Sequence, residues 1–195
     1  LKKKTKIFFA SNHILRESKR FQKLKKLINN KFFGKIYYFE GDYNYGRINK
    51  IINGWRGKIK DYSITLGGGI HLIDLSHFLL NEKIIEVKSY SNNLVTSNTK
   101  FRNKDCVVSI IKFKNNIIGK ITSNFGCVYP HFHKLSVYGT KKTFENYIEY
   151  GKIFTKRDKN IFVKLKEKYK PTNKSLKLNQ FLNSIIFKKN RNHYL

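Results

Sequence analysis

The chain has 195 residues, 40% of them hydrophobic and 15% aromatic, and its 41 Lys and Arg against 12 Asp and Glu give a formal net charge of +29. This length suits one ordinary domain, and the apolar content excludes a disordered polar chain. No run approaches the ~20 apolar residues of a membrane span, and the Lys-rich start lacks the apolar core of a signal peptide. The two cysteines, Cys106 and Cys127, argue against a disulfide scaffold and favour a reducing cytoplasm.

The positive charge makes nucleic acid the obvious competing partner, because a strongly basic chain binds phosphate polyanions. The basic residues are spread over the whole length, however, and lysine outnumbers arginine, whose forked guanidinium suits phosphates and bases. Lys, Asn, Ile, Phe and Tyr are abundant together, as an A/T-rich coding sequence would produce. We interpret the charge as compositional and do not expect a nucleic-acid partner. The alternative is a non-catalytic basic α+β domain that binds nucleic acid or an anionic surface.

The first part of the chain predicts a strand, a helix and a second strand. Residues 6–10 are a short apolar run typical of a strand. Ser18 is a suitable N-cap for a helix, and an aromatic strand follows at 35–43. The helix should bury Phe21, Leu24, Leu27 and Ile28, and the strand should place Tyr37, Phe39 and Tyr43 on one side. Residues 44–65 predict a long loop, of the kind that is usually functional.

The remainder predicts one buried helix and a series of strands. Residues 70–80 are apolar on nearly every side and should form the helix. Strands are expected at 84–90, 105–113, 117–125, 132–138, 143–150 and 160–164, and Ser175 should cap a last helix with Leu178, Phe181, Leu182 and Ile185 inward. A two-residue hairpin loop at Asn115-Asn116 would place Cys106 opposite Phe125 and diagonal to Cys127. The pattern predicts an α+β fold: an open, mostly antiparallel mixed sheet with helices packed on one face.

Three glycines, Gly67 to Gly69, lead into the predicted helix, whose first turn carries His71. A helix start has unpaired N–H groups and the positive end of the dipole, so it disfavours a cationic imidazole. His71 is therefore suited to accept a proton near neutral pH, and Asp74, one turn later, to hydrogen-bond the imidazole or a substrate hydroxyl. The alternatives are an ordinary buried histidine and a carboxylate that favours the helix dipole. His77 falls off the His71 face, so we interpret it as structural.

The segment Gly69-Ile-His71-Leu-Ile-Asp74-Leu resembles the C-terminal-domain signature of the glucose–fructose oxidoreductase/inositol dehydrogenase (Gfo/Idh/MocA) family. Further blocks resemble that family in the same order, over about residues 5–187: 12–16, 21–28, 33–37, Gly54-Trp55-Arg56, 137–140 and 181–185. The resemblance implies one C-terminal-type domain over residues 1–195. The Gly-x-Gly-x-x-Gly turn and the Glu-Lys-Pro motif of the family's Rossmann domain do not occur, so we expect a fragment or truncated product.

The resemblance implies an NAD(P)-dependent oxidoreductase whose complete form oxidises or reduces a hydroxyl of a sugar, cyclitol or nucleotide sugar. His71 and Asp74 would be catalytic, and Gly68 and Gly69 would let the cofactor approach the backbone. The candidate substrate contacts are Arg16, Tyr43, Trp55 and Arg56, because Arg suits anionic groups and Trp a sugar face; solvated charges and a sheet aromatic are the alternatives. Without the Rossmann domain, we expect neither tight binding of NAD or NADP nor turnover. The family's free sheet face implies a homo-oligomer, and a dimerisation module alone is a further alternative.

One departure from the family pattern and one histidine pair bear on this chemistry. Many family members carry an aspartate four residues before the histidine, whereas this chain has Gly67, which leaves the Asp/His pair incomplete. Asp61 in the preceding loop is the candidate to replace it. His131 and His133 lie on one strand face, but no carboxylate or cysteine at ligand spacing accompanies them, so we expect no metal.

Overall fold

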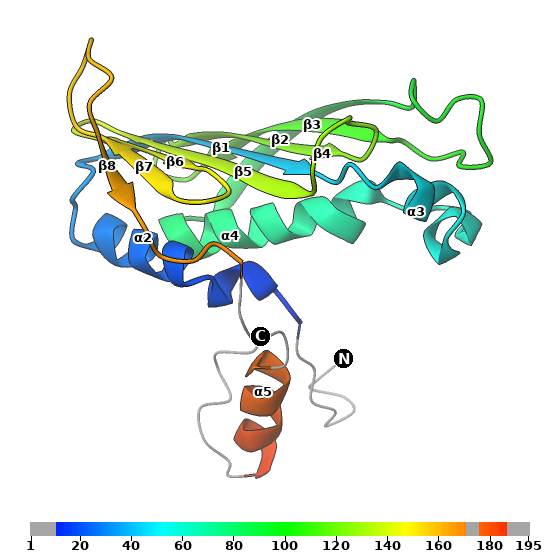
Figure 1. The fold of residues 1–195 in the computed structure, drawn as a ribbon, viewed down its shortest axis with the longest axis horizontal. Coiled ribbons are helices and arrows are strands. Elements are labelled where there is room, and N and C mark those ends of the chain that lie inside the picture. Colours follow the sequence, from blue (N-terminus) through cyan, green and yellow to red (C-terminus); the bar gives the residue numbers. More distant parts are fainter. Residues whose placement is uncertain (1–10, 171–175, 187–195) are drawn as a thin grey trace.

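The computed structural model describes residues 11–170 and 176–186. Its strands are β1 (Ile36–Asn44), β2 (Ile84–Asn92), β3 (Cys106–Phe113), β4 (Ile118–Asn124), β5 (Phe132–Gly139), β6 (Thr143–Asn146), β7 (Gly151–Phe154) and β8 (Phe162–Leu165). They form one sheet in the order β2-β3-β4-β1-β5-β6-β7-β8, in which the β1–β4 pair is parallel and the other neighbours are antiparallel. Helices α2 (Lys19–Asn29) and α4 (Ile70–Leu80) lie side by side on one face of the sheet (Figure 1). The predicted α+β fold is confirmed.

Helix α2 begins and packs as its sequence predicts. The Ser18 hydroxyl accepts a hydrogen bond from the Phe21 main-chain N–H and so caps the first turn. Phe21 and Leu24 are fully buried, and Leu27 and Ile28 pack against the same core. The apolar stripe therefore fixes α2 against α4 and the sheet.

A buried arginine connects α2 to the β6–β8 end of the sheet. Arg20 is fully buried, and its guanidinium donates hydrogen bonds to the Asn146 side-chain oxygen and to the main-chain oxygens of Tyr147, Glu149 and Glu167. These acceptors lie at the end of β6, in the turn before β7 and in the segment after β8. The Arg20 side chain thus joins three segments that are distant in sequence: α2, residues 146–149 and the segment after β8.

The long segment 44–65 is not the simple loop that the sequence predicts. It contains helix α3 (Ile48–Ile52) and the 3-10 helix η2 (Trp55–Lys58), and Ile51 is fully buried. Tyr45, Tyr62 and Ile64 are buried as well, so several apolar anchors fold this segment back onto the domain.

The predicted common face of Tyr37, Phe39 and Tyr43 is wrong for its first member. Phe39 and Tyr43 are buried, but Tyr37 is 53% exposed. The register between β1 and β5 is irregular between Ile36 and Tyr38, and such a bulge reverses the side on which the intervening residue lies.

The predicted two-residue hairpin loop is also wrong by one residue. The Phe113 N–H donates to the Ile117 carbonyl, which leaves a three-residue loop, 114–116, with Asn116 at a φ of 58°. Cys106 consequently pairs with Asn124 instead of Phe125. Cys106 and Cys127 carry free thiols.

The last third of the sheet is built from shorter strands than expected. The strand predicted at 143–150 ends at Asn146, because the chain turns with the Tyr147 N–H bonded to the Tyr150 carbonyl, and β7 follows unpredicted. Helix α5 (Leu176–Ile186) lies away from the sheet, with Leu178 and Leu182 exposed and not inward (Figure 1). The predicted strand at 6–10 and the Ser175 cap lie outside the described residues. Of the described helices, none is long and apolar enough to cross a membrane.

Candidate active site

The glycine run forms a π-helical turn, Thr65–Gly69, that continues directly into α4. A Cβ on Gly68 would lie 2.5 Å from the Tyr43 ring, and one on Gly69 would lie 2.1 Å from the Ser123 hydroxyl. The turn can therefore pack onto β1 and β4 only without side chains at these positions. This close approach places His71 over the end of β1.

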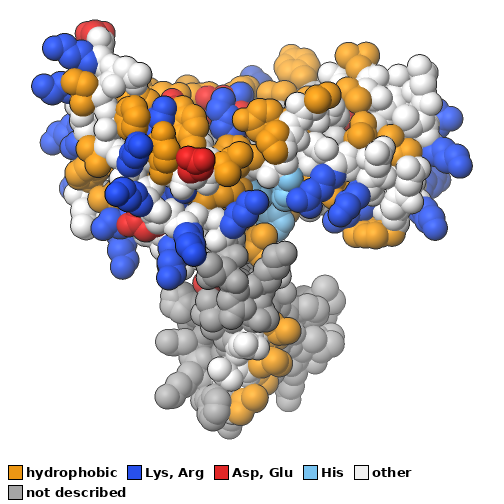
Figure 2. Space-filling view, viewed as in Figure 1, with side chains coloured by type: hydrophobic (Ala, Val, Ile, Leu, Met, Phe, Trp, Pro, Cys, Tyr) orange, Lys and Arg blue, Asp and Glu red, His pale blue; other side chains and the backbone are white. Residues whose placement is uncertain are grey.

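His71 lies in a group of rings that we call the histidine cluster: His13, His71, His131, His133 and Tyr43. The His71 ring centroid is 6.4 Å from that of His13, 6.2 Å from that of Tyr43 and 6.3 Å from that of His133. The cluster thus combines side chains from α4, β1, the start of β5 and the residue before the helix η1 (Ile14–Glu17). Histidine side chains reach the surface below the sheet, flanked by Lys and Arg (Figure 2).

The electrostatics of His71 suit a proton acceptor. Burial, and secondly the neighbouring His13, lower the pKa of His71 below its ordinary value of 6.5, while Asp74 acts in the opposite direction. Its Nδ1 atom is buried and has no hydrogen-bond partner. Buried polar atoms normally have partners, so an unpartnered one needs an explanation. A neutral imidazole with an unpartnered nitrogen is the form that a general base requires.

Asp74 is held by an arginine. Arg16 donates from Nε to Oδ2 at 2.8 Å and from Nη2 to Oδ1 at 2.5 Å, and His13 Nε2 lies 3.7 Å from Oδ1. Such a forked pair fixes the carboxylate strongly. Asp74 therefore acts on His71 through its charge, and the Arg16 guanidinium, a predicted substrate contact, is bound to Asp74.

The other predicted substrate contacts divide into two groups. Tyr43 belongs to the cluster: its hydroxyl lies 3.3 Å from His131 Nε2, and burial raises its pKa to about 12. Trp55 and Arg56 lie on η2, where Trp55 is 61% exposed and the Arg56 guanidinium lies 4.6 Å from the Trp55 ring. The Trp55 ring contacts Tyr62, with centroids 6.4 Å apart. Trp55 is thus an exposed aromatic surface next to the turn that carries His71.

The sequence model of the GFO/IDH/MocA C-terminal domain family matches residues 21–145. The chain belongs to this family. The resemblance inferred from the Gly-x-His-x-x-Asp segment is therefore confirmed. No curated protein matches the sequence.

Solved structures share the fold of this GFO/IDH/MocA domain. An oxidoreductase from Thermotoga maritima matches with a TM-score of 0.76 and 16% identity, over 98% of this chain and 57% of that one. Levoglucosan dehydrogenase in complex with NADH matches with a TM-score of 0.74 and 16% identity, over 94% of this chain and 58% of that one. A third match is an inositol dehydrogenase homologue from Azotobacter vinelandii in complex with NADH and myo-inositol. Its TM-score is 0.66 and its identity 14%, over 80% of this chain and 42% of that one. The chain thus spans about half the length of these proteins.

The structure shows which side chain occupies the space beside Gly67 in this GFO/IDH/MocA domain. A Cβ at Gly67 would lie 1.8 Å from the Tyr62 hydroxyl, which occupies that space. The Tyr62 hydroxyl is itself buried without a hydrogen-bond partner. Tyr62, and not the exposed Asp61, is the polar group next to this turn. Nothing in the sequence marks Tyr62 for this position, because only the packing shows which side chain fills the space.

The two glycines predicted to face the cofactor have another role here. Gly68 and Gly69 are buried against Tyr43 and Ser123, so a nicotinamide cannot approach their backbone. They do not fit a cofactor-binding role in this structure. Within residues 11–170 and 176–186, no three His, Cys, Asp or Glu side chains are grouped to hold a metal ion.

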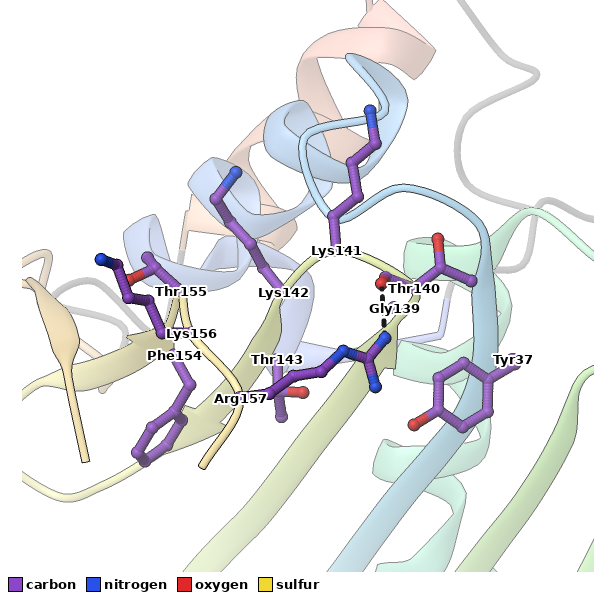
Figure 3. Close-up of a pocket in the computed structure, with 10 residues that line it drawn as sticks. All are labelled: Tyr37, Gly139, Thr140, Lys141, Lys142, Thr143, Phe154, Thr155, Lys156 and Arg157. Carbon is purple, nitrogen blue, oxygen red and sulfur yellow. Dashed lines mark hydrogen bonds between the residues drawn. The ribbon is translucent and has the colours of Figure 1, made fainter. Parts of the chain in front are cut away.

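A separate hollow of about 370 Å³ lies at the opposite end of β1 and β5 (Figure 3). It is lined by basic side chains, but the amino groups of Lys141, Lys142 and Lys156 point away from Arg157, which donates to the Thr140 carbonyl at 3.3 Å. These cations do not converge on one anion position. The histidine cluster is therefore the better candidate for the functional site.

Proposed function

We propose that this domain is the substrate side of an NAD(P)-dependent oxidoreductase that acts on a hydroxyl of a sugar, cyclitol or nucleotide sugar. The observation that carries the proposal is the neutral, unpartnered His71 imidazole at the start of α4, in a cluster where histidine side chains reach the surface. The family assignment supports it, as do two relatives of the same fold, one with bound NADH and myo-inositol and one named levoglucosan dehydrogenase.

His71 would accept the proton of the substrate hydroxyl at Nδ1. Burial and His13 keep the imidazole neutral before the reaction, and the Asp74 carboxylate stabilises the imidazolium once the proton has arrived. Arg16 holds Asp74 in place through its two hydrogen bonds. Asp74 and Arg16 are thus positioning residues, while His71 touches the reacting group.

The nicotinamide cofactor would be held by a Rossmann unit outside the described residues, since Gly68 and Gly69 do not fit it. This chain alone is therefore expected to bind NAD(H) no tighter than millimolar and to show no turnover. We also propose that the open sheet face pairs two copies of the chain. The exposed apolar residues that the strand register places on this face lie on β2, β3 and β4: Tyr90, Ile110 and Ile118.

Equilibrium binding to the purified chain tests the proposed function. We expect myo-inositol or levoglucosan to bind, and His71→Leu to weaken that binding at least about threefold, because it removes one hydrogen-bonding group. His77→Leu, an exposed histidine on the same helix, is the matched control and should bind as the parent does. If the chain instead binds heteropolymer DNA with a steep salt dependence and does not bind the polyol, the result would support the alternative of a non-catalytic basic binding domain.

A further inference from the structure

His133 on β5 is held by hydrogen bonds on three sides. It is 5% exposed. Its main-chain carbonyl accepts from the Asn146 side chain at 2.9 Å, and its main-chain N–H donates to the Tyr169 hydroxyl at 3.0 Å. The same hydroxyl is hydrogen-bonded to the imidazole Nδ1. The ring therefore has one fixed orientation.

The Tyr169 hydroxyl also fixes which ring nitrogen carries the proton. It accepts the main-chain N–H of His133, and among the described residues Nδ1 is the acceptor within reach of its own hydrogen. Burial raises the pKa of Tyr169 and lowers that of His133 to about 3, so the phenol stays protonated and the imidazole neutral. A neutral imidazole that accepts at Nδ1 carries its proton on Nε2.

The resulting donor is unused within the protein. His133 Nε2 is buried without a hydrogen-bond partner, as is His71 Nδ1, and the two ring centroids are 6.3 Å apart. An unpaired buried polar atom is destabilising, so two of them in neighbouring rings need an explanation. The centroid separation is compatible with hydrogen bonds of about 2.8–3.0 Å from one ligand oxygen to each ring.

We propose that His133 is a further substrate-binding residue, whose Nε2–H donates a hydrogen bond to the same hydroxyl oxygen that gives its proton to His71, and that Tyr169 positions it. The inference rests on the proposed function, and it specifies that the reacting group of the substrate is a hydroxyl and not an amine. An alcohol oxygen can accept from His133 while it donates to His71, whereas an ammonium group cannot accept. In the reverse direction, a carbonyl oxygen accepts from His133 and from protonated His71. The His131 ring, which is half-buried with its centroid 5.2 Å from that of His133, borders this pair.

Three variants of the whole chain test this role. His133→Leu removes the donor but suits the apolar surroundings, and we expect it to bind the polyol about tenfold more weakly, the upper range for one hydrogen bond. His133→Gln keeps an N–H donor and should bind within about threefold of the parent. His77→Leu is the matched control and should not change affinity. Circular dichroism confirms that each variant is folded.

Nitrogen NMR of the histidine rings gives a readout that a merely structural role would not move. In the parent chain, His133 should be the Nε2–H tautomer, and its Nε2 signal should shift when the polyol binds. Tyr169→Phe should give a mixture of His133 tautomers. It should also weaken polyol binding to the same extent as His133→Leu.

The outcomes separate this inference from the proposed function. The role of His133 alone is overturned if polyol binding shifts the His71 signals but not those of His133, and if His133→Leu binds the polyol as the parent does. An Nδ1–H tautomer in the parent chain overturns it as well. The absence of polyol binding to the parent chain overturns both proposals.

Discussion

Lowering the pH from 8 to 5 is expected to reduce the free energy of unfolding by about 4 kcal/mol. Burial, as the main cause, lowers the pKa of His131 to about 4 and that of His133 to about 3, from an ordinary value of 6.5. The folded state thus keeps both rings neutral while the unfolded chain takes up two protons. The stabilisation is complete above pH 6.5 and is lost as the pH falls toward 4 and 3.

The surrounding charges act in the same direction. Arg47, Lys170 and His71 each lower the pKa of His131, and His131 and His71 lower that of His133. Urea unfolding at pH 8, 6.5 and 5 measures the effect. His133→Leu should remove a large part of the pH dependence, since it removes one of the histidines whose pKa burial lowers, while His71 and His131 remain. An unfolding free energy that is constant from pH 8 to 5 would contradict the buried, neutral histidine cluster.

Arg20→Met is expected to lower the free energy of unfolding by about 3 kcal/mol. The substitution keeps much of the apolar stem but leaves the side-chain oxygen of Asn146 and the carbonyls of Tyr147, Glu149 and Glu167 without their donor. The Asn146 oxygen is buried and the three carbonyls are bonded in part-buried positions, so most of the loss should come from Asn146 and the carbonyls should add to it. Chemical denaturation at pH 8 avoids any contribution from the histidines.

The matched control for Arg20 is Lys23→Met, which makes the same removal of positive charge at an exposed position on α2. It should change the free energy of unfolding by less than about 0.5 kcal/mol. If both variants lost the same small amount, the buried guanidinium would not hold the three segments together.

The local elements were predictable because each depends on residues close in sequence. The spacing of apolar residues and the Ser18 cap predicted α2, and the apolar run after Gly69 predicted α4 with the bounds that the structure shows, residues 70–80. Tyr37 and the hairpin loop were wrong because a bulge and a third loop residue shift strand register, and neither leaves a mark in apolar alternation.

The candidate site was predictable only in its local part. The glycine run indicated His71 and Asp74, and the structure brings Tyr43 to the same place. The pair His131 and His133 was visible as a pattern but was considered only for a metal. Tyr62 and Tyr169 could not be predicted, because their roles depend on packing against Gly67 and β5 across long stretches of chain.

A titration of the His71 ring signals by NMR, with and without saturating myo-inositol, tests the central claim that His71 is an open proton acceptor for a hydroxyl. We predict a pKa below 6.5 in the free chain that falls further with the polyol, because a hydroxyl that donates to Nδ1 stabilises the neutral ring. A pKa at or above 6.5 that the polyol does not change would contradict the account.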